Sequence, residues 1–273
     1  MFLKMFFPLR KGSAGSFRLL TLLSLALVLA SGCSTSQKKL TLTIKGVEYA
    51  FRWCPAGAFN MGSPQDEAGR SNDETQHPET LSRGFYMLET EVTQSMWEGV
   101  MGNNPSHFKG SKLPVECVSW NDCQEYVQKL NALGVAPKGY RFSLPTEAQW
   151  EYACRAGTTT AFCFGDTLTD DKANYAGRVG DTSDVASYPA NAWGLHNMHG
   201  NVCEWCSDWY GDYPNGAVTD PTGAVEGSSR VFRGGSWADV AEDCRSAARH
   251  FDDPSNRGNA GLGMRVSLVS SGE

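Results

Sequence analysis

The sequence is short of positive charge. Its 273 residues contain 24 Lys and Arg against 30 Asp and Glu, a net charge of −6. The first 32 residues hold four of the basic residues and no acidic ones, so the rest of the chain is more acidic still. Proteins bind nucleic acids and anionic lipid surfaces largely through an excess of Lys and Arg. The charge balance therefore argues against nucleic acid as a partner.

The chain also lacks a hydrophobic run long enough to cross a bilayer, which takes about 20 residues. A largely apolar run over residues 19–29 follows a basic segment and precedes Ala30-Ser31-Gly32-Cys33. This order is typical of a lipoprotein signal peptide over residues 1–32, with Cys33 as the acylated first mature residue. Residues 33–39 form a polar tether. We expect an exported protein, anchored by lipid to a membrane at the outer membrane, the periplasmic face or the cell surface. The alternatives are an uncleaved anchor and a plain secretory signal.

Histidines are few, and there is no second C-x-x-C motif. His196 and His199, two of the five His, have no third ligand at a matching spacing and are expected to be ordinary surface or turn residues. Cys203 and Cys206 form a lone C-x-x-C without a helix start, which disfavours both a zinc site and a redox motif. Nine cysteines in an exported chain permit disulfides, whose connectivity the residues leave open.

The middle of the chain lacks helical periodicity, and residues 157–236 indicate turns. Regular elements are expected before it: opening strands over 40–52, a loop over 63–79, a strand over 84–89, and helices over 93–100, 119–133 and 145–153. The expected N-caps are Thr93, Ser119 or Asn121, and Thr146 with Gln149 completing a capping box; Gly134 should end the second helix. These elements predict one loop-rich α+β domain over residues 40–269, with short strands and two or three helices.

Residues 194–211 contain two Trp, one Tyr, two acids, two Asn and three Gly within eighteen residues. The pattern fits neither an amphipathic helix nor a simple strand. Glycines allow tight turns, which let amide and carboxylate oxygens converge, and calcium prefers oxygen ligands. Trp205 and Trp209 are expected to anchor the stretch to a core. The residues therefore predict a calcium-binding loop; the alternative is that Asn197 and Glu204 only tie the loop by hydrogen bonds.

The same stretch resembles the signature of the formylglycine-generating enzyme family, or sulfatase-modifying-factor domain. Five other segments are similar to it in the same order: PAGAFNMGS from Pro55, ETEVT from Glu89, LPTEAQWEYACRAG from Leu144, RGGSW from Arg233 and GLGMRV from Gly261. The resemblance implies an enlarged C-type-lectin-like fold. It also implies, for active members, a copper-dependent oxidase that converts a sulfatase cysteine to formylglycine.

The resemblance implies particular site residues. It carries calcium ligands onto Asn197, Gly200, Val202 and Glu204, the glycine and valine through their carbonyl oxygens. A second calcium site is carried onto Asn174 and the Tyr175 carbonyl, with Asp181 or Asp184 as a further ligand. It also implies a disulfide between Cys154 and Cys244.

The chain departs from the family after Arg233-Gly234-Gly235-Ser236-Trp237. Active members carry two reactive cysteines there, which bind copper(I), whereas residues 238–249 contain only Cys244. A pair of Cys244 with a distant cysteine is the remaining route to the oxidase. A third branch of the family uses a His-rich iron site beside a helical domain, and five scattered His do not support it. We therefore expect a non-catalytic module that binds a protein, peptide or glycan, with the oxidase as the alternative.

The C-terminal segments also resemble the variable region of retroelement-diversified lectin-fold proteins. If that resemblance holds, the ligand-binding positions are Ala238, Asp239, Val240, Asp243, His250, Phe251 and Asn256, with Asp252, Asp253 and Asn259 as further tolerant positions. Undiversified family members share the same frame, so a generic binding site remains the broader expectation.

Overall fold

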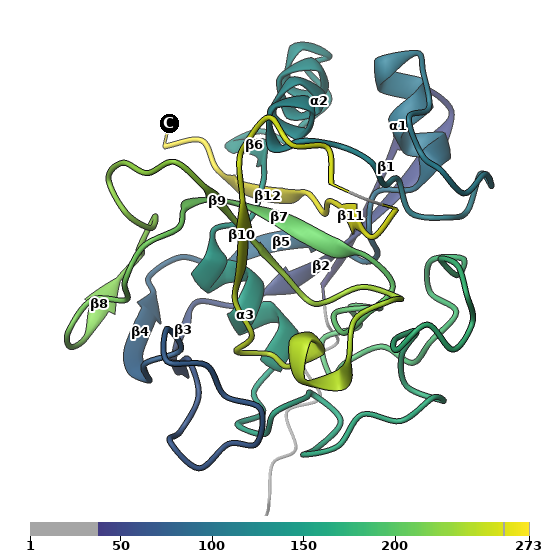
Figure 1. Ribbon diagram of the computed structural model, residues 1–273. Helices are drawn as coiled ribbons and strands as arrows, with labels where there is room; N and C mark the ends of the chain where they lie inside the picture. The colour runs from purple at the N-terminus through teal and green to yellow at the C-terminus, as the bar shows by residue number, and fades with distance from the viewer. Residues whose placement is uncertain (1–37, 259, 273) are drawn as a thin grey trace, which may run out of the picture. The chain divides into compact units, whose positions relative to one another are not determined.

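A computed structural model describes residues 38–258 and 260–272 (Figure 1). The expected signal peptide, Cys33 and Asn259 lie outside these residues. No helix in the described part is long and apolar enough to cross a membrane.

The main sheet is antiparallel and has the order β1-β2-β5-β12-β6. Its strands are β1 (Lys39–Ile44), β2 (Val47–Cys54), β5 (Phe85–Leu88), β6 (Tyr140–Ser143) and β12 (Ser267–Ser270). The expected opening strands form the β1–β2 hairpin. The last strand, β12, inserts between β5 and β6, so both ends of the domain are joined in one sheet (Figure 1).

Two smaller sheets complete the strands. One has the order β10-β9-β7-β11, with β7 (Cys203–Trp209), β9 (Arg230–Arg233), β10 (His250–Asp252) and β11 (Leu262–Gly263). The other has the order β3-β4-β8, with β3 (Gly57–Met61), β4 (His77–Leu81) and β8 (Val218–Thr219). Two expectations are corrected. Residues 203–209 are a strand, because pairing with β9 and β11 overrides their mixed pattern, and the end of the expected 63–79 loop belongs to β4.

The three helices begin where the sequence indicates. They are α1 (Gln94–Met101), α2 (Trp120–Ala132) and α3 (Glu147–Arg155), with N-caps Thr93, Ser119 and Thr146. Ser119 forms a capping box with Asp122, and Thr146 forms one with Gln149. The α2 helix ends at Ala132 with Leu133 as its C-cap, and the expected Gly134 follows with a φ of +64°. A 3₁₀ helix, η1 (Ala241–Cys244), interrupts the C-terminal region.

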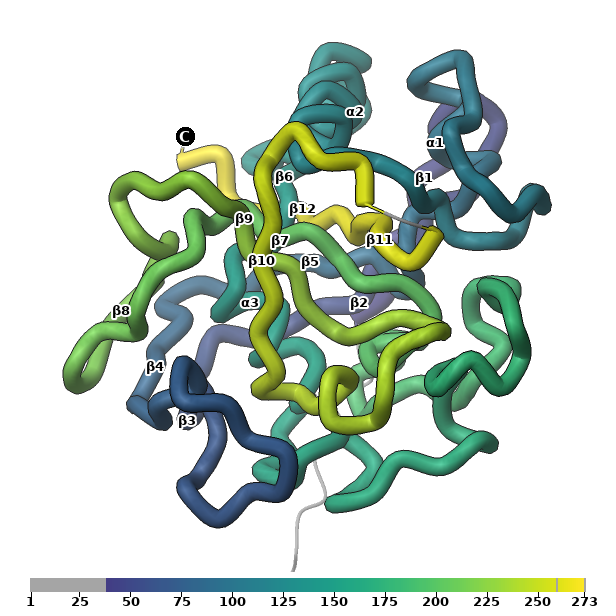
Figure 2. Tube along the Cα trace, viewed as in Figure 1, coloured from purple at the N-terminus to yellow at the C-terminus, as the bar shows by residue number. Residues whose placement is uncertain are grey.

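Two large hydrophobic clusters pack the sheets and helices together. One joins the main sheet to α1 and α2 and includes Cys203 and Trp205; the other packs around α3 and includes Trp150 and Cys206. Cys203 and Cys206 thus pack into different clusters, and this placement disfavours a redox-active pair of the two thiols. Between α3 and β7, residues 157–200 form irregular loops, drawn in teal to green in Figure 2.

Candidate functional site

The stretch predicted to bind calcium, residues 194–211, forms a largely buried turn followed by β7. Glu204 on β7 is 1% exposed, and both of its oxygens are engaged by neighbours. Arg265 donates from Nη2 to Oε1 at 2.7 Å and from Nε to both oxygens at 3.0 Å, while Trp150 Nε1 donates to Oε2 at 2.8 Å. Trp205 is fully buried, as expected for an anchor. Among the expected calcium ligands, Glu204 is therefore held by an arginine.

Asn197 is oriented by a buried carboxylate. Its Nδ2 donates to Glu91 at 3.1 and 3.2 Å, and Asn201 Nδ2 donates to Glu91 Oε1 at 2.7 Å. Burial raises the pKa of Glu91 to about 7; Arg265 opposes that rise and Glu204 adds to it. Because its amide nitrogen faces Glu91, Asn197 directs Oδ1 elsewhere, and that buried oxygen has no hydrogen-bond donor.

The second expected site is linked to the first through Asn201. Asn201 Oδ1 accepts from Ser183 N at 2.8 Å and from Asn174 Nδ2 at 3.4 Å. Asn174 Nδ2 also donates to the Asp181 carbonyl at 2.8 Å, which fixes the 181–183 loop beside it. Asn174 Oδ1 is again buried without a donor, and so is Thr182 Oγ1. Thr182 is a residue that sequence reasoning missed in favour of Asp181 or Asp184, both of which are exposed.

Gly200 is the point at which the two loops touch. Its φ is +79°, and a Cβ there would lie 2.2 Å from the Asn174 carbonyl oxygen. Only glycine avoids that collision. The other expected backbone ligand, the Tyr175 carbonyl, accepts a hydrogen bond from Arg178 N at 3.3 Å. Val202, also expected to offer its carbonyl, lies buried immediately before β7.

One of the two histidines of this stretch, His199, differs from expectation. His196 is half-buried, but His199 is 2% exposed, and burial lowers its pKa to about 4. The Cys244 carbonyl lies 2.8 Å from His199 Nδ1, and Cys163 N donates to Nε2 at 3.0 Å. Nδ1 therefore carries the proton of a neutral imidazole. The His199 side chain is buried and links its own turn to the segments around Cys163 and Cys244 by hydrogen bonds. Its position in the sequence does not reveal this role.

The expected Cys154–Cys244 disulfide is not formed, because both residues are free thiols. Cys154 Sγ lies 3.7 Å from Ser246 Oγ and 3.7 Å from His199 Nε2. Ser246, two residues after Cys244, is thus the residue of this segment whose side chain faces Cys154. Burial raises the pKa of Cys154 to about 12, although Ser246 opposes the rise.

Cys244 is fully buried beneath Gly235, where a Cβ would lie 2.5 Å from its Sγ. Burial raises its pKa, and the Asp239 carboxylate adds to the rise. Cys203 has the same environment: its Sγ lies 3.7 Å from Asp239 Oδ2, and burial, Asp239 and Cys244 raise its pKa. Asp239 itself accepts from Ser236 N at 2.9 Å and from Ser236 Oγ at 2.7 Å.

A charged network missed by sequence reasoning fixes the segment after Cys244. Arg233 is fully buried and donates to Glu147 at 3.0 Å, to Glu151 at 2.5 Å and to the Ser246 carbonyl at 2.7 Å. Arg249 donates to the same Glu147 at 2.7 and 2.9 Å. These ion pairs tie the C-terminal segment to α3.

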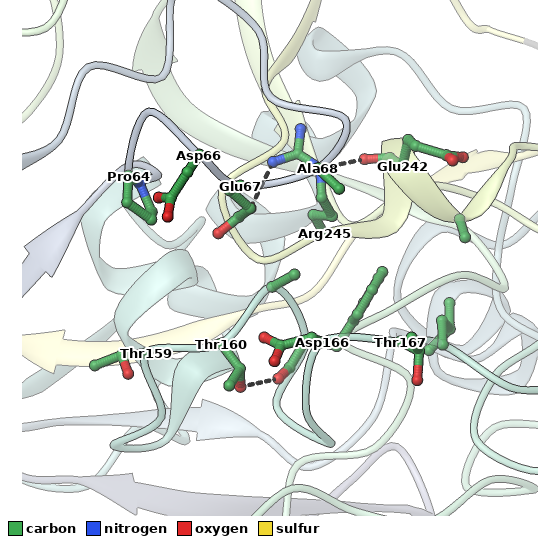
Figure 3. Close-up of a pocket in the computed structure, with 14 residues that line it drawn as sticks. Pro64, Asp66, Glu67, Ala68, Thr159, Thr160, Asp166, Thr167, Glu242 and Arg245 are labelled. Atoms are coloured by element: carbon green, nitrogen blue, oxygen red, sulfur yellow. Dashed lines mark hydrogen bonds and ion pairs between the residues drawn. The ribbon is translucent and has the colours of Figure 1, made fainter.

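A cavity of about 590 Å³ adjoins η1 (Figure 3). Asp66, Glu67 and Arg245 line one side, and Thr160 and Asp166 line the other (Figure 3). Arg245 donates to Glu67 at 2.7 Å and to Glu74 at 2.6 and 2.8 Å, so its charge is already paired. The polar groups that the cavity leaves free are therefore mainly carboxylates and hydroxyls, within a lining that also includes Phe162 and Leu168.

The expected ligand-binding positions divide by exposure. Ala238, Val240, Phe251 and Asn256 are exposed, whereas Asp239, Asp243 and His250 are half-buried. Phe251 is 50% exposed and stacks on Tyr210 with ring centroids 3.9 Å apart. Ala241 and Glu242 of η1 line the cavity, and Val240 immediately precedes them. Among the described residues, no group of three or more His, Cys, Asp or Glu is arranged to hold a metal ion.

A family model described as "Sulfatase-modifying factor enzyme 1-like domain" matches residues 47–268. The chain is 39% identical over 170 residues to the formylglycine-generating enzyme of Streptomyces coelicolor, covering 55% of this chain and 51% of the enzyme. It is 39% identical over 149 residues to the serine/threonine-protein kinase pkn1 of Chlamydia caviae, covering 53% of this chain but 22% of the kinase.

Among solved structures, Treponema denticola variable protein 1 superposes with a TM-score of 0.76 at 31% identity. The match covers 84% of this chain and 98% of that protein. The expected α+β, C-type-lectin-like fold of the formylglycine-generating enzyme type is thereby confirmed. The chain spans about a fifth of the matched kinase and about half of the matched enzyme.

Proposed function

Because the chain belongs to the sulfatase-modifying factor enzyme 1-like family, we propose that it is a calcium-stabilised binding member without the copper oxidase site. Its ligand is a protein, peptide or glycan. A lipid on Cys33 anchors it to a membrane outside the cytoplasm.

One observation carries the non-catalytic part of this proposal. The segment after Trp237 offers one thiol, Cys244, which is fully buried with a raised pKa. Copper(I) favours thiolates, and a thiol with a raised pKa stays protonated at neutral pH. The residues present therefore do not fit the two-thiolate copper site of the family.

The binding part rests on the surface around η1. Val240 and Phe251 are large apolar side chains left 54% and 50% exposed, and a cavity of about 590 Å³ adjoins η1. Exposed loop residues on a rigid scaffold are common ligand contacts. The similarity to a protein named as variable supports a site built from tolerant positions.

The calcium part rests on the buried acceptors that lack donors. Asn197 Oδ1, Asn174 Oδ1 and Thr182 Oγ1 are uncharged oxygens of the kind that calcium binds alongside backbone carbonyls. A bound cation would compensate the cost of burying them and hold the two loops in place. We assign it a structural role only.

Calcium binding is tested by melting and denaturation. A free calcium concentration about a hundred times the dissociation constant should stabilise the fold by roughly 3 kcal/mol. The gain should shrink in Asn197→Ala and persist in Asn60→Ala, an exposed amide outside the network. Equal stability with calcium and with a chelator would remove the calcium proposal.

Catalysis is tested with a sulfatase-type peptide. The mature protein, incubated with copper, oxygen and a thiol reductant, should leave the mass of the substrate cysteine unchanged. Conversion of that cysteine to an aldehyde, abolished by Cys244→Ser, would show that the protein is an oxidase.

One specific observation favours the oxidase as the second candidate. Cys203 and Cys244 both lie near Asp239, and Cys244 is near enough to raise the pKa of Cys203. A rearranged pair of these two thiols would bind copper(I) with a stoichiometry of one. Loss of that binding in both Cys203→Ser and Cys244→Ser, but not in Cys123→Ser, would identify the pair.

A further inference from the structure

A second cavity, of about 310 Å³, opens between β4, the first turn of α3 and the 211–224 loop. No residue lines both this cavity and the one beside η1. Its polar lining includes His77, Glu79, Glu147, Asp208 and Arg249. None of these residues belongs to the calcium network or to the expected ligand-binding positions.

His77 is held as a cation. Its Nδ1 lies 2.9 Å from the Thr75 carbonyl oxygen, and its Nε2 lies 2.9 Å from Glu79 Oε1. Both partners only accept hydrogen bonds, so both ring nitrogens must carry protons. Burial alone would lower the pKa of His77, but the bonds to Glu79 and Thr75 outweigh it and raise that pKa.

One carboxylate oxygen of Glu79 accepts no hydrogen bond. Its side chain is 1% exposed, and Oε2 has no hydrogen-bond partner. Asp208 accepts through Oδ2, from Glu147 N at 3.0 Å and from Ser207 Oγ at 2.9 Å. A buried carboxylate oxygen without a donor is costly, so the lining has unused acceptor capacity.

The cationic side chains of the lining have no comparable spare capacity. All three guanidinium nitrogens of Arg249 already donate, two of them to Glu147 and one to the Asp73 carbonyl. Both nitrogens of His77 are likewise engaged. An anion would therefore find few charged donors and would face Glu79 and Asp208. A group that only donates, and is positively charged, fits this lining.

We propose that this cavity binds a primary ammonium group on an alkyl chain, such as a lysine side chain or an aliphatic amine. The ammonium donates to Glu79 Oε2 and lies near Asp208. An ammonium has three donors and no acceptor, and bonds between charged groups are stronger than neutral ones. The alkyl chain packs against the aromatic and proline part of the lining, Tyr213 and Pro214.

The test uses n-pentylamine, with n-pentanol and pentanoate as neutral and anionic controls of similar size. Calorimetric titration of the mature protein at pH 8 should show the amine binding at least about tenfold more tightly than the alcohol, a difference of about 1.4 kcal/mol. Pentanoate should not bind. Equal binding of amine and alcohol, or no binding of the amine, would overturn the proposal.

Variants locate the site. Glu79→Gln should weaken amine binding about tenfold or more, whereas Glu226→Gln, an exposed acid outside the cavity, should leave it unchanged. Glu79→Gln also removes the partner of the buried His77 imidazolium, so it could weaken binding by disturbing the fold. A second variant, Val218→Phe, therefore tests the same site by narrowing the cavity without altering a charge. Unchanged amine affinity in Val218→Phe would place the amine elsewhere and refute the assignment.

Discussion

At the scale of single residues, Ser246 explains why the expected disulfide is absent. Its Oγ lies 3.7 Å from Cys154 Sγ, while Cys244 points beneath Gly235. In sequence the two positions are two residues apart, and a motif match cannot decide which of them faces α3.

Ser246→Cys should therefore create the bridge that the native chain lacks. Under oxidising conditions two free thiols should disappear from the thiol count, and the loop of roughly 90 residues predicts a stabilisation of about 4.6 kcal/mol in the chain-entropy model. Ser246→Ala, which offers no thiol, should leave the count unchanged. An unfolded Ser246→Cys variant with the same number of reactive thiols before and after oxidation would contradict this placement.

Asp208 makes stability depend on pH. Burial raises its pKa to about 7, and the Glu147 carboxylate adds to the rise, whereas the ordinary value is 3.8. The folded state therefore holds this proton more tightly than the unfolded state, so the contribution of Asp208 to stability falls as the pH rises from about 4 to 7.

Asp208→Asn should remove that slope. Denaturant unfolding between pH 4 and 8 should show that the stability difference, variant minus wild type, grows in favour of the variant as the pH rises. Each pKa unit corresponds to about 1.4 kcal/mol. A difference that stays constant across this range would mean that Asp208 titrates normally.

At the scale of elements, Asn201 joins two loops that are distant in sequence. It donates to Glu91 and accepts from Ser183 N and Asn174 Nδ2, and it is fully buried. Its removal would leave several buried polar groups without partners.

Asn201→Ala should therefore destabilise the fold by about 2–3 kcal/mol, since each unsatisfied buried group costs roughly 1–3 kcal/mol. If the two cation sites share this link, the calcium-dependent gain should fall as well, although Asn201 supplies no proposed ligand. Asn215→Ala, at an exposed loop position, is the matched control. A variant that keeps the full calcium gain would show that the two loops bind cations independently.

At the scale of the whole molecule, the proposed lipid on Cys33 would anchor the domain to a membrane. Wild-type protein should incorporate labelled fatty acid and partition with membranes, because a lipobox cysteine is acylated when the signal is cleaved. Cys33→Ala should lose the label and either accumulate unprocessed or be released. Cys117→Ala is a control at a cysteine within the domain. Absence of label in the wild type would refute the lipid anchor.

Much of the architecture followed from local sequence. The helix starts at Thr93, Ser119 and Thr146 were predictable, because a cap bonds to backbone only two or three residues away. The β1–β2 hairpin was predictable from alternation. The strand at 203–209 was not, because its partners β9 and β11 lie about 25 and 60 residues further along the chain and override the local pattern.

The sequence by itself determined the family, the positions of the caps and the presence of a single cysteine after Trp237. These are properties of local spacing and residue type. Only the tertiary structure decided that Glu204 pairs with Arg265, that His199 is a buried strut, and that Asn174, Thr182 and Asn197 have unpartnered oxygens. Each of these depends on which side chains from remote segments meet in the interior, where burial fixes both the partner and the charge state. Residue spacing along the chain does not contain that information.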